Sequence, residues 1–548
     1  IENIYENIDS MKEGKVKNNL IEHMDLAFLS KKLSRINREV PIEFNFDELK
    51  IYKDFELNKV VELYKEYELK SIMSKIGFED KTSSENENLH INKVNNIEEL
   101  ENLVKNIHKN ARILYLDCDT RGDKVSNLDF ENIYLNFNNK SYLICRELIE
   151  ENFDLISKIF SCEVKKVCFN SKIIYKIMFK HNKEINNVIF DIILAEYLIN
   201  PGKECDVLSL CSNYANTYLN EDKKYLGICC FEKIYNILKN KIEENNMEDL
   251  YFEIENPLSL VLAKTELEGF KVCLNTLNYL KEKFEIKIKE YSEKIYDLAG
   301  EEFNINSPKQ LGKILFEKLD LPVIKKTKTG YSTNADVLEA LIDKHDIINE
   351  IINYRQITKL QSTYITGLIE VIDNDGKIHT SFNQTITVTG RLSSTDPNLQ
   401  NIPIKYPLGR EIRKVFIPDN EECVILSADY SQIELRVLAH ISEDKQMIEA
   451  FRNNLDIHKI TASEIFSVEE DEVTTEMRNK CKAVNFGIVY GISDFALSQD
   501  LKISRKEAKE YMDKYFARYV GVKYYLDNII EFSKQNGYVR TIFNRIRN

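Results

Sequence analysis

The stretch MRNKCKAVNFGIVYG, residues 477–491, predicts one helix with two different faces. Arg478, Lys482, Phe486 and Tyr490 follow one another at intervals of four and therefore form one stripe. Cations suit the phosphates of a nucleotide and flat rings suit its base, so this order matches a helix that grips a nucleoside triphosphate lengthwise. A solvated helix face shows the same spacing, and for this helix alone both interpretations stay open.

A second stripe on the same helix is apolar and contains Met477, Cys481, Val484 and Ile488. A core can form on that side, because apolar side chains at helical spacing pack together. The cationic stripe would then remain accessible.

The composition indicates a soluble globular protein. With 548 residues, 43% hydrophobic and 30% charged, the chain has room for roughly two to four domains. No apolar run approaches a membrane span, so no membrane contact is expected. The 11 Cys are scattered without a CxxC, which predicts a reducing, cytoplasmic location and no zinc site. The net charge of −14 argues against non-specific nucleic-acid binding but allows a local basic groove.

The pattern along the chain predicts the domain organisation. Residues 1–75 are expected to form short helices, and the polar segment 80–96 a linker. Strand candidates alternate with helices over residues 97–250, which predicts an α/β domain. Residues 251–548 begin with long helical patterns and then mix strands with helices, as in an α+β domain. No GxxxxGK[ST] or GxGxxG motif occurs, so phosphate binding must rely on side-chain cations and metal.

A possible metal ligand follows an apolar run. Residues 424–428 are predicted to form a buried strand, and Asp429 stands directly at its end. A carboxylate held there is rigid yet open to a cleft, which suits a metal ion. Glu434 lies near the start of the next helix. The competing interpretation makes Asp429 a helix N-cap.

Three further polar segments are weaker signals. Clustered lysines with small hydroxyl residues suit phosphate contacts, although a solvated loop is the simpler alternative. The segments are TVTGRLSSTDPNLQNIP with Arg391, Gln400 and Asn401, DIHKITASEIF with His458, and IKKTKTGYST with Lys325, Lys326 and Lys328.

Taken together, these motifs resemble those of the bacterial family A DNA polymerases. The matching segments are DYSQIELR at 429–436, RNKCKAVNFGIVYG at 478–491 and TGRLSSTDPNLQNIP at 389–403. The resemblance implies an RNase H-like 3′–5′ exonuclease-type domain over 97–250, followed by a right-hand polymerase domain. In that domain the thumb would span about 265–370, with palm and fingers from about 375. It also implies a monomer that uses primer–template DNA, dNTPs and two Mg²⁺ ions in replication and repair.

The resemblance assigns a role to each matching residue. Asp429 and the Tyr430 carbonyl would bind Mg²⁺, and Lys482 would protonate the leaving pyrophosphate. Glu434 would exclude a ribose 2′-hydroxyl. The nucleotide would contact Arg478, Lys482, His458, Gln432, Phe486 and Tyr490, and DNA would contact Arg391, Gln400, Asn401, Lys325, Lys326 and Lys328.

The exonuclease-type site is expected to be degenerate. Asp117 and Asp119 remain, but Ile174 and Lys233 occupy positions where the family has Asp. Asp191 is interpreted as structural. A two-metal nuclease needs several carboxylates, so no proofreading is expected.

The ends of the sequence lead to a further expectation. Residues 1–79 resemble the end of the family's 5′ nuclease domain, and the chain stops before the family's second metal-binding motif, His-Asp-Glu. We therefore expect a polymerase truncated at both ends that binds DNA but hardly extends it. A non-catalytic DNA- and dNTP-binding fragment and a 3′–5′ exonuclease are the alternatives.

Overall fold

The computed structural model describes residues 1–11, 14–36, 41, 60, 63–64, 67 and 89–548, apart from 204, 328–329 and 404–406. They belong to two compact units, Ile1–Ser84 and Glu85–Asn548. Short helices were predicted for residues 1–75, and the described part of this range contains α1 (Glu2–Glu6), α2 (Lys15–Glu22) and α3 (Met24–Ser34). Most of the predicted linker 80–96 lies outside the described residues.

The end of that predicted linker is a strand instead. β1 (Ile91–Val94) pairs in parallel with β4 (Lys140–Cys145) at the edge of a six-stranded sheet. Val94 is 5% exposed and packs in the same core as Leu100 and Leu103. An edge strand needs only one hydrogen-bonded neighbour and one inward-facing apolar side chain. Four residues of this kind are too few to stand out in a polar segment.

The sheet has the order β1-β4-β3-β2-β5-β6 and mixes directions. β2, β3 and β4 form an antiparallel meander, whereas β5 and β6 run parallel to β2 and to each other. This confirms the α/β prediction for residues 97–250. The strand bounds are β2 (Ile113–Arg121), β3 (Asp129–Phe137), β5 (Lys165–Cys168) and β6 (Val188–Asp191).

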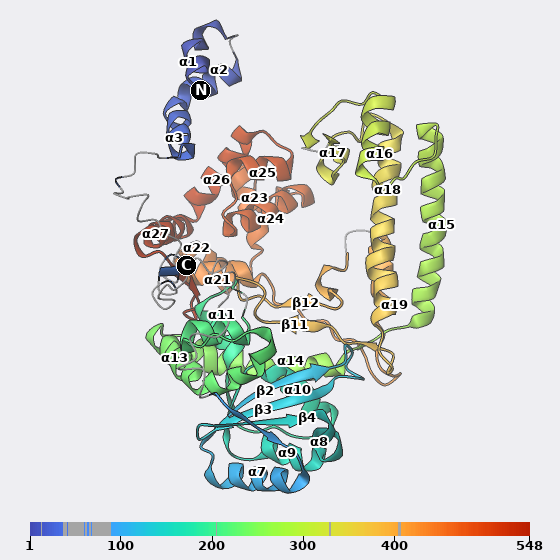
Figure 1. The fold of residues 1–548 in the computed structure, drawn as a ribbon. Helices are drawn as coiled ribbons and strands as arrows, with labels where there is room; N and C mark the ends of the chain where they lie inside the picture. Colours follow the sequence, from blue (N-terminus) through green and yellow to red (C-terminus); the bar gives the residue numbers. More distant parts are fainter. Residues whose placement is uncertain are drawn as a thin grey trace, which may run out of the picture. The chain divides into compact units, whose positions relative to one another are not determined.

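Each face of the sheet has its own core, because side chains alternate along a strand. Leu114 and Leu116 of β2 face one core, and Tyr115 faces the other. Figure 1 shows α7 and α9 below the strands and α11 and α13 above them. The helices of this region are α7 (Ile97–Asn110), α8 (Arg146–Glu151), α9 (Phe153–Ser161), α10 (Ser171–Lys180), α11 (Ile192–Ile199), α12 (Val207–Leu210), α13 (Phe231–Glu244) and α14 (Asn256–Glu268).

A long helical pair follows, within the predicted thumb. α15 (Leu274–Ala299) packs along α18 (Asp346–Leu360), and α18 continues through Gln361–Thr366 into α19 (Gly367–Val371). Its smaller elements are α16 (Pro308–Lys313), α17 (Ala335–Glu339) and the hairpin β8 (Lys326–Thr327) with β9 (Gly330–Tyr331).

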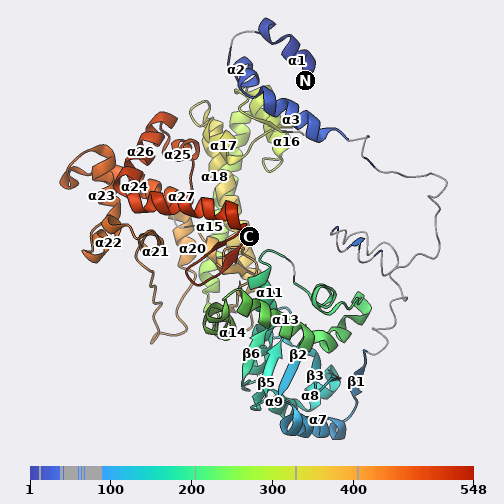
Figure 2. The same cartoon turned by 90° about the vertical axis from the view of Figure 1, so that its left-hand side faces the viewer.

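Residues 433–536 form a helical bundle around one core. The predicted apolar stripe lies there: Cys481 and Val484 are fully buried, and Met477 packs against the core. Figure 2 shows α24, α25 and α26 gathered near α23. The bundle comprises α21 (Ile433–Ser442), α22 (Lys445–Arg452), α23 (Ile457–Phe466), α24 (Thr475–Val489), α25 (Asp494–Leu501), α26 (Arg505–Arg518) and α27 (Val520–Asn536).

Short strand pairs connect these helical regions. The bounds are β7 (Phe270–Lys271) with β10 (Lys377–Ile378), β11 (Ser381–Asn383) with β12 (Ser393–Thr395), and β13 (Val539–Arg540) with β14 (Ile546–Arg547), together with helix α20 (Pro407–Arg413).

The predicted buried strand at residues 424–428 is wrong. This segment has no regular structure, and Val424 and Leu426 are 86% and 87% exposed. A buried strand needs neighbours that pair with its N–H and C=O groups, and none of the described strands pairs with it. Its apolar side chains therefore stay in solvent.

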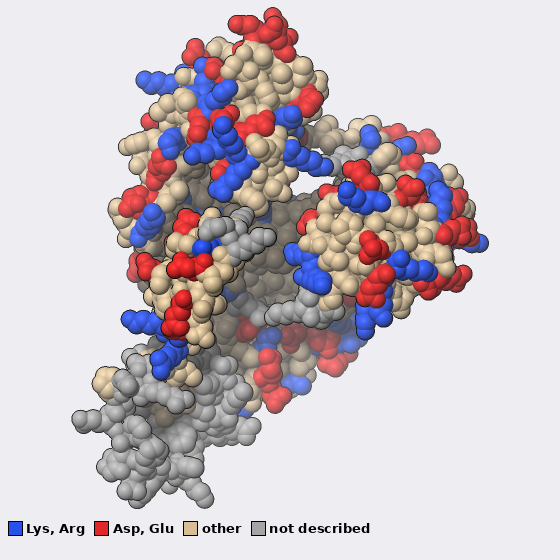
Figure 3. Space-filling model, turned by 90° about the horizontal axis from the view of Figure 1, so that it is seen from above, with Lys and Arg blue, Asp and Glu red and all other residues tan. Residues whose placement is uncertain are grey.

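The surface carries both signs of charge. Figure 3 shows Lys and Arg side chains intermingled with Asp and Glu side chains over the face that it draws. The net charge of −14 therefore does not produce a uniformly acidic surface on that face. Among the described residues, no helix is long and apolar enough to cross a membrane.

Candidate functional site

The predicted cationic stripe lies on the face of helix α24 that turns away from the core of the bundle. Thr474 caps the helix by accepting from the Met477 amide, and the buried apolar stripe fixes which face turns away from the core. Lys482 is exposed, and Phe486 is half-buried. The helix ends at Val489, so Tyr490 lies just past its last turn and is 63% exposed.

The first cation of the stripe is held by a neighbouring helix. Arg478 Nε donates to Asp456 Oδ2 at 2.7 Å, and Asp456 caps α23 by accepting from the amides of His458 and Lys459. Burial alone would raise the pKa of Asp456, but the guanidinium and the two amides lower it. Asp456 thus ties the start of α23 to α24 and orients Arg478.

His458 lies between the two helices and is almost fully enclosed, with 2% of its surface exposed. Its ring is 5.8 Å from that of Phe486, and its Nδ1 is 2.9 Å from Asn485 Nδ2. Burial lowers its pKa to about 4; Asp456 opposes this, while Arg478 and Lys482 add to it. The imidazole is therefore neutral at pH 7.

A second cluster joins three elements that are far apart in the sequence. Tyr490 donates its hydroxyl to Glu434 at 2.7 Å, and Arg391 Nη2 contacts Glu434 at 2.5 Å and Tyr490 at 3.0 Å. Arg391 comes from the turn before β12, Glu434 from the first turn of α21, and Tyr490 from the end of α24. The structure thus brings three predicted site residues together at one end of the cationic stripe.

The predicted metal ligands are exposed. Asp429 and Tyr430 lie in the irregular segment before α21, and Tyr430 is 79% exposed. Gln432 adopts φ +53° and is the N-cap residue of α21. Across the described part of the chain, no group of three His, Cys, Asp or Glu side chains could hold a metal ion. One carboxylate alone does not fit a two-metal centre.

The remaining predicted DNA contacts are dispersed. Gln400 Nε2 donates to the Leu392 carbonyl at 3.2 Å, and Tyr364 donates its hydroxyl to the Asn401 carbonyl. Lys326 lies 5.7 Å from the centre of the Tyr331 ring in the β8–β9 hairpin. Lys325 is exposed at the start of that hairpin, and Lys328 lies outside the described residues.

In the exonuclease-type domain, Asp117 and Asp119 lie on β2. Asp117 accepts from the Cys118 amide at 2.8 Å, and Asp119 accepts from the Tyr134 hydroxyl at 2.5 Å. Burial raises the pKa of Asp117 to about 7, with Asp119 adding to the effect and Lys224 opposing it. Such a carboxyl is partly protonated near pH 7.

The other residues of this degenerate site point elsewhere. Ile174 is 1% exposed and belongs to the core on one face of the sheet. Lys233 donates to the Ala215 carbonyl at 3.1 Å. Asp191 caps α11 and accepts from the amide and the hydroxyl of Ser171 at 2.6 and 2.7 Å. These contacts agree with the structural role predicted for Asp191.

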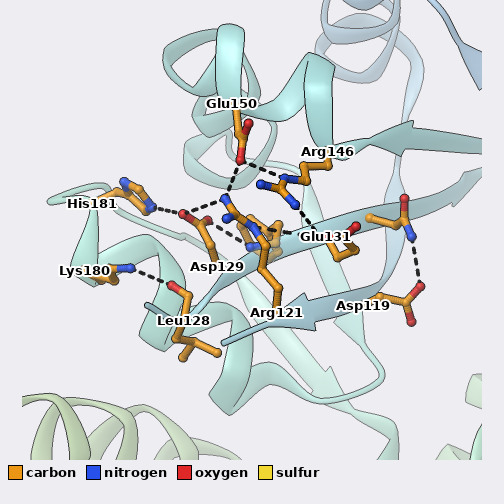
Figure 4. Close-up of polar contacts among 11 residues, drawn as sticks. Asp119, Arg121, Leu128, Asp129, Glu131, Arg146, Glu150, Lys180 and His181 are labelled. Carbon is orange, nitrogen blue, oxygen red and sulfur yellow. Dashed lines mark hydrogen bonds and ion pairs between the residues drawn. The ribbon is translucent and has the colours of Figure 1, made fainter. Parts of the chain in front are cut away.

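A set of carboxylates near the end of the β2–β3 hairpin is neutralised. Figure 4 shows Arg121 and Arg146 reaching Glu150, at 2.6 and 2.9 Å, while Asp119 hydrogen-bonds apart from this network. His181 contacts Asp129 at 3.1 Å. Because each of these carboxylates has a cationic or imidazole partner, the network stabilises the hairpin and offers no ready metal site.

Two residues next to the cationic stripe of α24, Asp456 and Asn485, were not predicted from the sequence. Asp456 had a usable signal, because Asp directly before an apolar helical run is a common N-cap. Asn485 is fully buried on the core side of α24. A polar amide next to the apolar stripe is a signal of a buried hydrogen-bond partner.

The chain thus combines a six-stranded sheet with helices on both faces, a long helical pair and a helical bundle in which one helix carries a cationic stripe. Two family models match the chain: DNA polymerase family A over residues 274–548, and the ribonuclease H-like domain of DNA polymerase I over residues 118–227. The chain belongs to DNA polymerase family A.

Relatives and a solved structure agree with this family. The chain is 41% identical to DNA polymerase I of Bacillus subtilis and 42% identical to that of Caldicellulosiruptor bescii. Those alignments cover 100% of this chain but 64% and 63% of the relatives, so the chain spans less than two thirds of their length. The POL domain of Pol1 from M. smegmatis, solved in complex with DNA primer–template and dNTP, matches with a TM-score of 0.75 and 33% identity. That match covers 83% of this chain and 81% of the other.

Proposed function

We propose that this chain carries the nucleotide-binding half of a template-directed DNA polymerase, which transfers a nucleotide from a dNTP to a primer 3′-hydroxyl. The proposal rests on the stripe of α24. Arg478 and Lys482 lie along this stripe, and the cluster of Arg391, Glu434 and Tyr490 lies at its end. Such a row places phosphate-binding cations at one end of a nucleotide and sugar- and base-contacting groups at the other.

Each group has a distinct part in this proposal. Phosphoryl transfer builds negative charge on the triphosphate oxygens, so Arg478 and Lys482 stabilise the reacting state more than the ground state. Lys482 also supplies a proton to the leaving pyrophosphate. Glu434, held by Tyr490 and Arg391, fills the place of a ribose 2′-hydroxyl and selects deoxynucleotides.

The family implies a divalent metal ion in the reaction. Asp429 and the Tyr430 carbonyl would contribute ligands, and we propose Mg²⁺ as the ion. Because Asp429 is the one carboxylate that the resemblance assigns to this site within residues 1–548, we expect this polypeptide to bind primer–template and dNTP but to extend slowly. Robust extension of a labelled primer by residues 1–548 would contradict that expectation.

A binding titration tests the central proposal. The chain is mixed with a dideoxy-terminated primer–template, and each of the four dNTPs is added in turn. We expect the templated dNTP to tighten the complex and the other three to leave it unchanged. If all four dNTPs act alike, or none does, the chain is a non-specific binder and the proposal fails.

We also propose that the exonuclease-type domain does not proofread. Ile174 is in the core, Lys233 is turned to a backbone carbonyl, and Asp191 is occupied by Ser171. The test is incubation of a 3′-mismatched duplex with Mg²⁺. Removal of the mismatched nucleotide above the rate of a no-enzyme control would refute it.

A further inference from the structure

Two buried side chains form a hydrogen bond directly behind the cationic stripe. Asn485 Nδ2 is 2.9 Å from His458 Nδ1, and the two residues are 0% and 2% exposed. An amide nitrogen donates and does not accept, so Nδ1 must accept. The neutral ring has one proton, which is then on Nε2.

The carbonyl oxygen of the Asn485 side chain also has polar neighbours. Its Oδ1 lies 3.3 Å from Thr461 Oγ1. The Thr461 hydroxyl also lies 2.7 Å from the Ile457 carbonyl and 3.2 Å from the Tyr519 hydroxyl, on the segment between α26 and α27. A buried amide in a helix is costly unless its hydrogen bonds are made. In this arrangement Nδ2 is the end of the amide that faces the imidazole.

Burial keeps the His458 ring neutral by lowering its pKa, and the charged groups around it act in both directions. Arg478 and Lys482 on α24 disfavour the imidazolium, and Asp456 at the start of α23 favours it, but burial outweighs Asp456. A neutral ring with the proton on Nε2 is a hydrogen-bond donor. The same ring with its proton on Nδ1 would present a lone pair from Nε2 instead, and phosphate oxygens only accept.

We propose that Asn485 is a positioning residue that selects the Nε2–H tautomer of His458, so that this N–H donates to a phosphate oxygen of the bound triphosphate. The inference rests on the proposed function, which assigns His458 to the triphosphate. It gives Asn485 a role in nucleotide affinity although its side chain is closed to solvent.

The first measurement is the tautomer itself. ¹⁵N-histidine labelling of the full chain, with His458→Gln to assign the signal among the 8 His, reports which ring nitrogen carries hydrogen. We expect Nε2–H in the wild type and a mixture of tautomers in Asn485→Leu. A wild-type ring with its proton on Nδ1 overturns the inference.

The second measurement is affinity for a dNTP on a dideoxy-terminated primer–template. Asn485→Leu should weaken binding about fivefold, the value of one hydrogen bond. In a His458→Ala background the same change should have no further effect, because Asn485 acts through the ring. Ser498→Ala is the matched control: Ser498 is 3% exposed in the same bundle and bonds to the Phe495 carbonyl, so its loss should leave affinity unchanged.

A third variant gives a pH signature that a purely structural role would not produce. In Asn485→Asp, a carboxylate accepts from Nδ1–H, so at high pH Nε2 loses its proton, whereas at low pH both nitrogens carry one. The ratio of variant to wild-type affinity should therefore fall as the pH rises. A constant ratio, or equal losses in the presence and absence of His458, overturns the inference. If the wild type binds no triphosphate, the proposed function fails as well, whereas normal affinity in Asn485→Leu defeats this inference alone.

Discussion

The predicted site residues lie together at the helical bundle of residues 433–536 but lie apart in the exonuclease-type domain. At the bundle, Arg391, Glu434 and Tyr490 come from three separate elements and contact one another. In the exonuclease-type domain, Ile174 enters the core and Lys233 pairs with a backbone carbonyl. One set converges on an open face, and the other is dispersed into the scaffold.

Under the proposal above, the exonuclease-type domain keeps its fold without its site. The six-stranded sheet and its two cores are complete, because they depend on the alternation of apolar residues along strands. A nuclease site depends instead on a few carboxylates that oppose folding through their mutual repulsion. When they are replaced by residues such as Ile174, the scaffold loses nothing and gains apolar contact.

Ile174→Asp is the strongest test of that difference. If the absence of this carboxylate were all that prevents nuclease activity, the new Asp would restore metal binding. Since Ile174 is 1% exposed among apolar side chains, we expect a loss of about 3–5 kcal/mol in the stability of this domain and no nuclease activity.

Urea unfolding followed by circular dichroism measures the loss. Ile173→Asp on the same helix is the matched control, because Ile173 is only partly buried and should cost less. A folded Ile174→Asp variant that removes a mismatched 3′ nucleotide would show that the site is latent rather than dismantled.

Helices and strands could be predicted from the sequence where the local pattern of residues determines them. The apolar stripe of α24 and the strands of the exonuclease-type sheet follow from periodicity. The grouping of Arg391, Glu434 and Tyr490 could be anticipated only from the family resemblance, because their positions differ by up to 99 in the sequence.

The failures have a common cause in tertiary context. Residues 424–428 have the composition of a buried strand, but composition does not say which strand will pair with them. β1 shows the reverse case, since a polar segment becomes a strand because β4 offers an edge. Asn485 was overlooked because its partner, His458, is 27 positions away on another helix.

A comparison of two lysines on α24 sharpens the proposal for the open face. Lys482 is exposed on the cationic stripe, whereas Lys480 pairs with Glu476 at 3.0 Å on another side of the helix. We expect Lys482→Ala to weaken dNTP binding roughly 30-fold, about 2 kcal/mol for a charge-assisted contact with phosphate, and Lys480→Ala to change it less than twofold.

Fluorescence titration with the templated dNTP on a dideoxy-terminated primer–template measures both variants. Equal losses would mean that only the overall charge of the helix matters. The stripe would then be a solvated face, and the contrast with the exonuclease-type domain would disappear.

Asp117→Asn should have the smallest effect and should depend on pH. The wild-type carboxyl has a pKa of about 7 in the folded chain, against about 3.9 when unfolded. Between these values the folded state holds one more proton than the unfolded state, so its stability decreases as the pH rises and levels off above 7. The substituted carboxamide cannot ionise and avoids that loss, while its oxygen can still accept from the Cys118 amide.

We therefore expect the variant to be more stable than the wild type by about 1–2 kcal/mol at pH 8, a figure reduced because the carboxyl is only half-buried. The difference should vanish below about pH 3, where the wild-type carboxyl is protonated in both states. Hydrogen exchange of the β2 and β5 amides in the full chain, corrected for intrinsic rates, reports the stability of this region. An equal gain at both pH values would trace the effect to packing. A variant less stable than the wild type at pH 8 would mean that the folded protein stabilises the Asp117 carboxylate, as a retained metal-binding site requires. The exonuclease-type domain would then resemble the helical bundle more than their contacts indicate.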